Sequence, residues 1–240
     1  MSVDAAIAFS PVGGAPERFA QARHWKRYVA HILAPYIGAR VLDVGAGIGS
    51  NTPYFAGKGV REWTSLEPDP AMARHIAAEV AAGELPPSRV IQGTTADLEP
   101  GARFDTILYL NVLEHIAEDK AELARVIRHL APGGALVVLC PAHRRLFAPF
   151  DAALGRRRRY DAAGLAALAP PRCALETTVM LDSIGYAAAL AARLLPRAVE
   201  PTPRRIAFWD RVLVPLSWVA DPLTFHRFGK TAVAVWRRLP

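Results

Sequence analysis

The sequence predicts an α/β protein built on a doubly wound, mostly parallel β-sheet. Two observations predict this fold. Short apolar runs alternate with longer stretches of helical spacing from residue 40 to residue 181, which is typical of successive βαβ units. A turn with glycine at every second position, Gly45, Gly47 and Gly49, directly follows the first of these runs. Such a turn between a strand and a helix is a common ligand-binding feature of parallel sheets.

The order of elements follows from periodicity, prolines and glycines. Apolar residues at helical spacing predict a first helix at Phe19–Leu33, in which Arg27 and Tyr28 are candidates to reach a ligand carboxylate. Asp161 is expected to cap a short helix. The predicted strands are Arg40–Val44, Trp63–Glu67, Arg89–Gln92, Phe104–Leu110, Ala135–Cys140, Cys173–Leu181 and Lys230–Arg237. The other predicted helices are Ile48–Gly57, Ala71–Ala82, Leu113–Leu130, Asp161–Leu168, Tyr186–Leu195 and Ile206–Val219.

Length and composition favour a single domain with a substantial core. The chain has 240 residues, of which 52% are hydrophobic, and a net charge of +7. We expect a flexible tail at residues 1–18 and one domain at residues 19–240. Its two cysteines suggest neither a disulfide framework nor a metal site. No signal peptide or stretch of membrane-spanning length is apparent, and a cytoplasmic location is expected.

The glycine turn itself restricts the kind of ligand. The nicotinamide dinucleotide fingerprint requires a third glycine where this chain has Ser50. Asp43 lies inside the strand that precedes the turn, where its carboxylate would repel a pyrophosphate and attract a positively charged group. A ligand with an amino or sulfonium group therefore fits this turn better than a dinucleotide does.

Polar residues also follow three further strands. Glu67 ends the second strand and can accept hydrogen bonds from two ribose hydroxyls. Asp97 follows the third strand and could accept from an adenine amine while Leu98 packs on the ring, and Asn111 ends the fourth. In an open α/β sheet these strand ends share one edge, where ligands bind. The sequence therefore predicts one composite nucleoside site.

The stretch from Asp43 to Gly49 resembles motif I of class I S-adenosylmethionine-dependent methyltransferases. Leu110–Ile116 and Leu130–Gly134 resemble the small-molecule branch of that group, which includes the ubiquinone-type O-methyltransferases. The resemblance implies a three-layer, Rossmann-like sheet whose antiparallel last strand inserts between the fifth and sixth. It also implies that S-adenosylmethionine is held by Asp43, Gly45, Ala46, Gly47, Gly49, Asn51, Thr52, Glu67, Pro68, Asp97, Leu98, Asn111, Val112 and His115.

The acceptor side is less explicit. We expect residues 141–170 to shape an acceptor pocket and residues 183–228, an insertion rich in apolar residues, to cover it like a lid. His143, His115 and Tyr160 are the candidate catalytic residues. The basic cluster at residues 156–159 could be a solvated loop, a clamp for an anionic acceptor or, without a stacking platform, a weak nucleic-acid contact.

These observations predict a methyltransferase that modifies a hydrophobic or anionic small molecule, at oxygen, by in-line displacement. An RNA methyltransferase and a non-catalytic, cofactor-binding partner subunit remain alternatives. Nucleic acid is the less favoured partner because the arginines are scattered along the chain. A homodimer, with the insertion as a dimer face, and contact of the insertion with a membrane surface also remain open.

Overall fold

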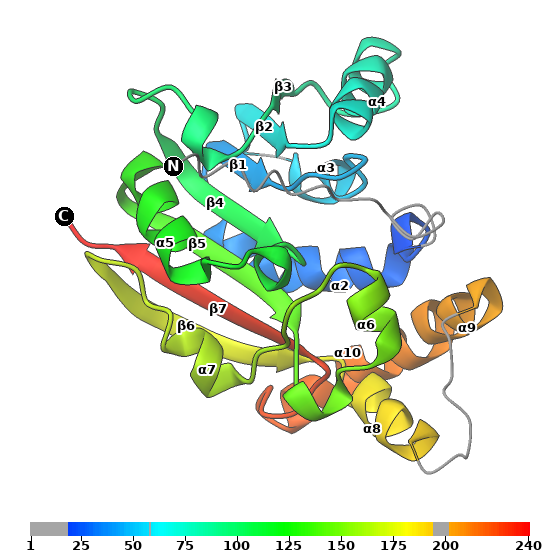
Figure 1. Ribbon diagram of the computed structural model, residues 1–240. Helices are drawn as coiled ribbons and strands as arrows, with labels where there is room; N and C mark the ends of the chain where they lie inside the picture. Colours follow the sequence, from blue (N-terminus) through cyan, green and yellow to red (C-terminus); the bar gives the residue numbers. More distant parts are fainter. Residues whose placement is uncertain (1–18, 58, 194–201) are drawn as a thin grey trace.

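Seven strands form one sheet in the order β3-β2-β1-β4-β5-β7-β6 (Figure 1). The computed structural model describes residues 19–57, 59–193 and 202–240, so the predicted tail at residues 1–18 lies outside the described residues. The strands are β1 (Arg40–Val44), β2 (Glu62–Glu67), β3 (Arg89–Gln92), β4 (Phe104–Leu110), β5 (Leu130–Pro141), β6 (Cys173–Leu181) and β7 (Thr231–Arg238). Strand β7 is antiparallel to both neighbours, whereas the other pairs are parallel. The predicted doubly wound sheet with an antiparallel last strand is confirmed.

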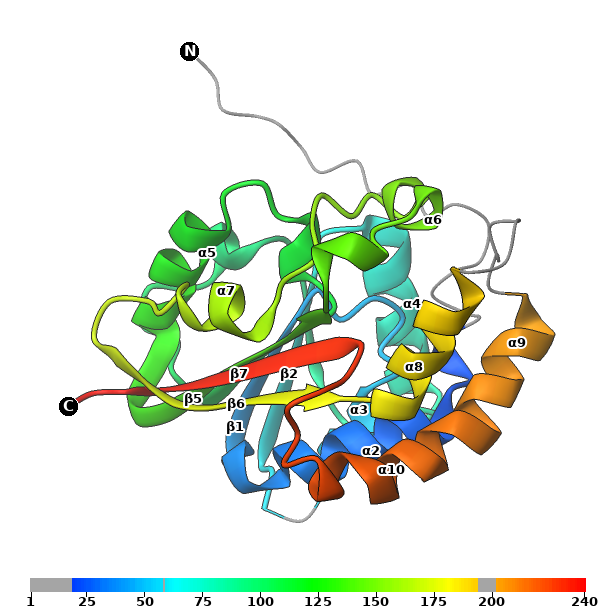
Figure 2. The same cartoon turned by 90° about the horizontal axis from the view of Figure 1, so that it is seen from below.

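Helices cover both faces of this sheet. They are α2 (Arg23–Leu33), α3 (Thr52–Phe55), α4 (Pro70–Ala81), α5 (Asp119–Val126), α6 (Pro149–Ala153), α7 (Ala162–Ala166), α8 (Ser183–Ala192), α9 (Pro203–Phe208) and α10 (Val214–Leu223). Short 3₁₀ turns are η1 (Ala34–Tyr36), η2 (Thr95–Asp97), η3 (Leu113–His115), η4 (Ile127–His129) and η5 (Arg144–Leu146), and a π-helical segment, η6 (Trp209–Leu213), joins α9 to α10. In Figure 2, α5 and α7 lie on one side of the sheet and α2 and α10 on the other.

The two faces of the sheet carry separate hydrophobic cores. Along β5, Leu136 and Val138 pack into the core that contains α5 and α7, while Val137 and Leu139 pack into the core that contains α2. This alternation follows from the two-residue period of a strand. Both faces are apolar because both are covered, as expected for a central strand of a three-layer fold.

The prediction of one helix at Leu113–Leu130 is wrong. The chain forms the turn η3, then α5, then η4, and β5 already begins at Leu130. Arg157 donates from Nε to the carbonyl of His115, and Arg158 donates from Nη2 to the carbonyl of Ala117. Ile116, at φ −82° and ψ 125°, is extended, so helical geometry ends there before α5 begins, and the two arginines fix the carbonyls on either side of it.

The first crossover helix is also shorter than predicted. Within Ile48–Gly57, only α3 is helical, because the glycine turn continues through a Thr52 N–H to Gly49 C=O bond of 3.0 Å before the helix starts. Strand β5 starts earlier than predicted, since Leu130 pairs with Phe104 ahead of an irregular stretch at residues 131–134. Asp161 caps α7 as predicted, accepting from the Gly164 N–H at 2.6 Å.

Two buried aspartates fix the insertion between β6 and β7 to the rest of the fold. Asp221 accepts from the Tyr28 hydroxyl at 2.7 Å and from the backbone of Asp182, also at 2.7 Å. Asp182 in turn accepts from Trp209 Nε1 at 2.6 Å and pairs with Lys230 at 3.0 Å. Hence α10 is tied to both α2 and the end of β6. Among the described residues, none of the helices combines the length and the apolar character needed to cross a membrane.

Candidate functional site

A cavity of about 1670 Å³ opens at the carboxyl edge of the parallel strands. Residues that follow β1, β2, β3 and β4, with residues of α2, line one part, and residues of the segment after β5, which includes α6, and of α8 and α9 line the remainder. This edge is where open α/β sheets bind ligands. Sites for one drug-sized ligand span about 300–1,000 Å³. The cavity is therefore large enough for two ligands side by side.

The glycine turn after β1 forms the floor of the first part. Gly45, Gly47 and Gly49 all have positive φ, at 66°, 62° and 73°. A Cβ on Gly45 would meet Val112 at 2.7 Å, whereas one on Gly47 would meet nothing within 4 Å. Gly47 lines the cavity. Its lack of a side chain therefore leaves open space beside the backbone, of the kind that a ligand occupies.

Glu67 joins the glycine turn to the end of β2. One carboxylate oxygen accepts from the Gly47 N–H at 2.7 Å, and the other accepts from the Asp69 N–H at 3.0 Å. Glu67 lines the cavity although it is only 5% exposed. Burial raises its pKa, and the two N–H bonds partly oppose that rise. The carboxylate is thus held in place, with its remaining lone pairs available to ligand hydroxyls.

Asp43 lies beneath the turn and does not line the cavity. It is 1% exposed, and its Oδ2 atom has no hydrogen-bond partner among the described residues. Burial, with a smaller contribution from the Glu67 carboxylate, raises the pKa of Asp43 to about 7. A positive charge bound above the turn would favour the ionised form of this carboxyl.

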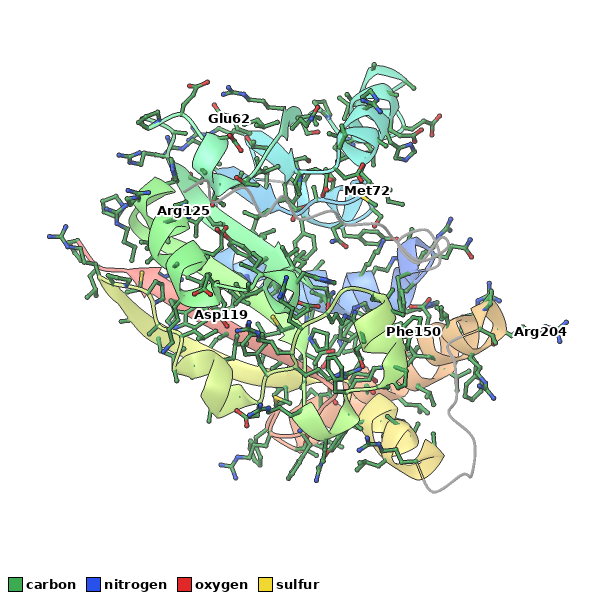
Figure 3. All side chains as sticks on the ribbon, viewed as in Figure 1. Glu62, Met72, Asp119, Arg125, Phe150 and Arg204 are labelled. Atoms are coloured by element: carbon green, nitrogen blue, oxygen red, sulfur yellow. The ribbon has the colours of Figure 1, made fainter. Side chains whose placement is uncertain are left out.

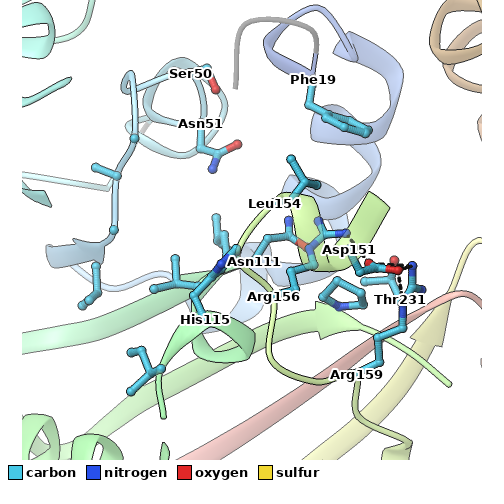
Figure 4. Close-up of a pocket in the computed structure, with 18 of the residues that line it drawn as sticks. Phe19, Ser50, Asn51, Asn111, His115, Asp151, Leu154, Arg156, Arg159 and Thr231 are labelled. Atoms are coloured by element: carbon cyan, nitrogen blue, oxygen red, sulfur yellow. Dashed lines mark hydrogen bonds and ion pairs between the residues drawn. The ribbon is translucent and has the colours of Figure 1, made fainter. Parts of the chain in front are cut away.

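Three further predicted residues reach the cavity from the loops after β3 and β4. Asp97 is held by the backbone and hydroxyl of Thr94, which lower its pKa. Asn111, at φ 60°, and His115 face the cavity from the segment after β4 (Figure 4). Burial and the neighbouring Arg156 guanidinium lower the pKa of His115 to about 4. The imidazole is therefore neutral at physiological pH.

Helix α2 contributes a cation that the sequence prediction missed. Lys26 lines the cavity and donates from Nζ to the carbonyls of Ala20 and Ser50, each at 3.0 Å. The prediction that Arg27 and Tyr28 reach the site is wrong, because Arg27 is exposed and Tyr28 is fully buried against Asp221. The signal was the stripe of Ala22, Lys26, Val29 and Leu33, on which a lysine interrupts the apolar, buried face.

The second part of the cavity is mainly apolar. Its lining side chains come from the segment after β5 and from the insertion: Leu146, Phe147, Pro149, Phe150, Leu154, Ala188, Ala189, Ala192, Ile206, Trp209 and Leu213. Cations border this apolar part at Arg156, Arg159 and Lys230. Figure 4 shows Arg156 and Arg159 on either side of Asp151, which also lines the cavity. Both arginines pair with Asp151 at 2.9 Å.

Comparisons with known proteins agree with this geometry. The sequence model of a methyltransferase domain matches residues 17–171, more than half of the chain. The chain belongs to the methyltransferase domain family. It is 31% identical over 207 residues to a trans-aconitate 2-methyltransferase of Deinococcus radiodurans, covering 81% of this chain and 76% of that protein.

Two further likenesses qualify this assignment. A demethylmenaquinone methyltransferase of Tropheryma whipplei is 34% identical over 143 residues, covering 55% of this chain and 54% of the relative. This methyltransferase domain thus spans about half the length of that relative. A putative sarcosine dimethylglycine methyltransferase from Galdieria sulphuraria has a TM-score of 0.61 over 90% of this chain and 86% of the other, with 18% identity. That likeness concerns the fold.

The structure separates the predicted site residues of this methyltransferase domain into two groups. Those that line the cavity are Gly45, Ala46, Gly47, Asn51, Glu67, Pro68, Asp97, Asn111, Val112 and His115. Those that do not are Asp43, Gly49, Thr52, Leu98, His143 and Tyr160. Gly49 packs beside Leu85, while Thr52 and Leu98 are buried.

Two of the three candidate catalytic residues lie outside the cavity. His143 shares a hydrogen bond of 2.8 Å between its Nε2 and the Gly229 carbonyl, and its ring stacks on Tyr186. Tyr160 donates its hydroxyl to Asp119 at 2.7 Å. His115 is the member of the predicted trio that the cavity includes.

The arginine cluster at residues 156–159 is largely neutralised inside the protein. Arg156 and Arg159 pair with Asp151, and Arg158 pairs with Asp119 at 2.8 Å. Arg156 also approaches the fully buried Glu114, with Nε 3.6 Å from Oε1. These pairs hold the segment after β5 against the segment after β4, so the cluster connects the two loops that border the cavity.

Proposed function

We propose that this chain is an S-adenosylmethionine-dependent methyltransferase that modifies an oxygen atom of a small, largely apolar acceptor. The observation that carries the proposal is the two-part cavity. One part contains the glycine turn and Glu67, and the other is lined mainly by apolar side chains. A methyl donor and an acceptor placed in these two parts would meet where they join.

The residues present fit the proposed cofactor. The open space beside Gly47 accommodates a ligand against the backbone, and Glu67 would accept from the ribose hydroxyls. Asp97 would accept from the adenine amine. Lys26 uses two of its three donors on backbone carbonyls, so the third can pair with the ligand carboxylate. The unpartnered Oδ2 of Asp43 supplies negative potential for a sulfonium.

When bound, the cofactor would supply an electrophilic methyl group for in-line displacement by the acceptor oxygen. The chain's own residues contribute alignment and exclusion of water, since the cavity walls of α6, α8 and α9 enclose the acceptor part. His115 is neutral because of its lowered pKa, and it would accept a hydrogen bond from the acceptor hydroxyl. With so low a pKa it would orient the acceptor more than keep its proton. The hydroxyl proton would pass to water as the O–CH3 bond forms and the S–CH3 bond of the donor breaks, which leaves the donor as a neutral thioether.

Oxygen is the proposed acceptor atom because the neutral imidazole of His115 can accept a hydrogen bond from a hydroxyl. Arg156, Arg159 and Lys230 border this part, but their charges are paired with Asp151 and Asp182, so they do not select between oxygen and nitrogen. The apolar lining favours an acceptor with an apolar body. Of the two relatives described above, one is named for demethylmenaquinone and the other for trans-aconitate. Both are small molecules, which supports this class of acceptor.

RNA as acceptor receives little support from the basic cluster. Three of its four arginines pair with Asp151 and Asp119, so their charge is largely compensated before any phosphate binds. A non-catalytic partner subunit would have the same cofactor site as an enzyme. A measurement of turnover distinguishes the two.

Calorimetry with S-adenosylmethionine tests the cofactor site. Glu67→Gln removes the ionised acceptor, and we expect affinity to fall by about 10- to 100-fold, because a hydrogen bond to a charged group contributes about 1.5–3 kcal/mol. Glu62→Gln, on the exposed start of the same strand, is the matched control and should bind as the wild type does. Absence of binding by the wild-type chain would refute the proposal.

Labelled donor with a fractionated cell extract then tests catalysis. We expect the label in the fraction that contains apolar small molecules. Label in RNA would show that the acceptor is RNA and not a small molecule. Binding of the cofactor without any labelled product would favour the partner-subunit alternative.

A further inference from the structure

An exposed apolar stripe runs along the outer side of α9, η6 and α10. Phe208, Val212, Leu216, Val219 and Leu223 follow one another at intervals of four, four, three and four residues. This spacing places them on one helical face. Their exposed fractions range from 41% to 77%. Figure 2 shows α9 and α10 as a nearly continuous rod on the outside of the molecule.

The loop after α10 extends this stripe. Phe225 and Phe228 are 80% and 57% exposed. Arg227 lies between them in sequence, with its guanidinium 5.9 Å from the centre of the Phe225 ring. Seven of the ten large exposed hydrophobic residues in the described ranges belong to this stripe and loop. We call them together the apolar face. Such a concentration marks an interaction surface.

Within residues 202–228, which carry the apolar face, the exposed arginines and the acidic residues are differently placed. Residues 202–228 include the exposed arginines Arg204, Arg205, Arg211 and Arg227, and Arg204 extends away from the protein body in Figure 3. The acids of the same segment, Asp210 and Asp221, are buried at 4% and 0% exposure. Both are engaged internally, with α2 and with Tyr28. The exposed surface of this segment is therefore apolar and cationic.

We propose that the apolar face binds the surface of an anionic phospholipid bilayer, with α9, η6 and α10 lying in the headgroup region. Apolar side chains would enter the acyl boundary while arginines pair with lipid phosphates. A second copy of the chain is a poorer occupant, because an isologous contact would bring the same arginines toward one another. An anionic bilayer complements both the apolar residues and the charge.

The apolar face lies close to the acceptor part of the cavity, so a bilayer bound to this face would lie close to that part as well. Ile206, Trp209 and Leu213 belong to the same helical rod, and their side chains line the apolar part of the cavity. One side of the rod thus faces the cavity while the other carries the apolar face. An acceptor dissolved in the bilayer would enter from the adjacent surface. The bilayer contact goes beyond the proposed methyl transfer and does not depend on it.

Co-sedimentation of the full chain with vesicles tests the inference. We expect binding to vesicles of phosphatidylcholine mixed with phosphatidylglycerol, weak binding to phosphatidylcholine alone, and weakening with added salt. The double variant Val219→Glu and Leu223→Glu changes two exposed side chains and should lower affinity by about tenfold or more. Leu175→Glu changes another exposed apolar side chain, on β6 and away from the apolar face; it is the control and should bind as the wild type does.

Separate measurements keep the outcomes distinct. Calorimetry with S-adenosylmethionine shows whether the double variant keeps its fold and cofactor site, independently of the vesicles. Wild-type chain that does not sediment with anionic vesicles would overturn the inference, as would a double variant that binds them undiminished. A wild-type dimer in sedimentation velocity that becomes monomeric in the double variant would assign the face to a second copy instead.

Discussion

Gly45 and Gly47 share a left-handed backbone for different physical reasons. Gly45 is confined by Val112, whose side chain would collide with any Cβ, whereas Gly47 borders open cavity. A substitution at Gly45 therefore acts on folding, while one at Gly47 acts on the space that a ligand would take. The motif pattern alone treats the two positions alike.

Substitution of Gly47 by alanine separates ligand binding from stability. Gly47→Ala should cost about 1–2 kcal/mol of unfolding free energy, because of its positive φ. It should also weaken S-adenosylmethionine binding by about tenfold or more, since the new methyl occupies ligand space. Gly83→Ala, at φ 75° with open space around the added Cβ, carries a similar backbone penalty at a site outside the cavity. Calorimetry should show unchanged affinity for that control; equal affinities in both variants would contradict the assignment of Gly47.

Asp43 should make the stability of the ligand-free protein fall with rising pH. The pKa of Asp43 is about 7 in the folded protein, compared with an ordinary value of 3.8. As the pH rises, the unfolded chain therefore loses this proton before the folded protein does. The free energy of unfolding then decreases between those values, by up to about 4 kcal/mol at about 1.4 kcal/mol per unit. Asp43→Asn cannot ionise, so it should be more stable than the wild type at about pH 8 and not at about pH 4. Urea unfolding at both values measures this difference.

Asp105 provides a control of opposite sign. The Arg40 guanidinium beside it lowers the pKa of Asp105, so its contribution to stability is present above the unfolded pKa and is lost in acid. Asp105→Asn should therefore destabilise the protein at neutral pH. A stabilising effect of Asp43→Asn that did not vary with pH would contradict the explanation by ionisation. Asp43→Asn should also bind the sulfonium cofactor more weakly, because it lacks the negative charge of the carboxylate.

At the scale of elements, the start of α2 depends on the insertion. Ala22, the residue before the helix, has no capping side chain. Instead, Asp210 of η6 accepts from the N–H groups of His24 and Trp25, at 3.3 Å and 2.9 Å. It also shares a hydrogen bond of 3.1 Å with the His24 ring. A remote carboxylate thus caps the helix that places Lys26 and Trp25 in the cavity.

Removal of this cap should affect both stability and ligand binding. Asp210→Ala should lower the free energy of unfolding by about 1–2 kcal/mol and also weaken binding of S-adenosylmethionine, because Lys26 loses its support. Asp161→Ala removes the cap of α7, which has no residue in the cavity, so it should lower stability alone. Thermal unfolding and calorimetry of the two variants give the comparison. Undiminished affinity in Asp210→Ala would show that α2 holds its position without the cap.

Further buried contacts bear on whether the insertion acts as a lid. Asp221 ties α10 to Tyr28, Trp218 stacks on Tyr28 at 5.1 Å, and Asp182 ties the start of α8 to Lys230. These buried contacts anchor α10 and the start of α8 to α2 and to the strand ends beside the cavity. The lid function of residues 183–228 remains a prediction, and residues 194–201 of that stretch lie outside the described residues.

At the scale of the whole molecule, the cavity joins residues that are far apart in sequence. Its lining residues extend from Phe19, ahead of α2, through to Thr231 of β7. The unfolded chain has no such arrangement, so a ligand of the cavity binds the folded state alone and stabilises it.

S-adenosylhomocysteine should therefore raise the unfolding temperature of the intact chain. At a concentration about 100 times its Kd, the gain is about 2.7 kcal/mol, or about 5–10 °C for a chain of this size. Differential scanning fluorimetry measures the shift. Glu67→Gln should show a smaller shift at the same concentration, and no shift in the wild-type chain would argue against a cofactor site in the cavity.

The sequence by itself determined the sheet, most strand boundaries and the position of the glycine turn. The bounds predicted for Arg40–Val44, Arg89–Gln92, Phe104–Leu110 and Cys173–Leu181 agree with the structure. Local sequence was sufficient because β1 and β4 are nearly continuous buried apolar runs. The partly exposed edge strands β3 and β6 are preceded by the pairs Pro86–Pro87 and Pro170–Pro171, which mark turns. The carboxyl-edge rule predicts that Glu67, Asp97 and Asn111 lie together, and all three line the cavity.

Only the tertiary structure decided which charged groups face the cavity and which are compensated inside the fold. Lys26 rather than Arg27 lines the site, Asp151 and Asp119 neutralise the arginine cluster, and Asp210 caps α2 from nearly two hundred residues away. These outcomes depend on pairings between segments that are distant in sequence. The local sequence does not determine the surroundings of a charged side chain. Those surroundings are set when packing brings its partner within hydrogen-bond distance and removes water from both.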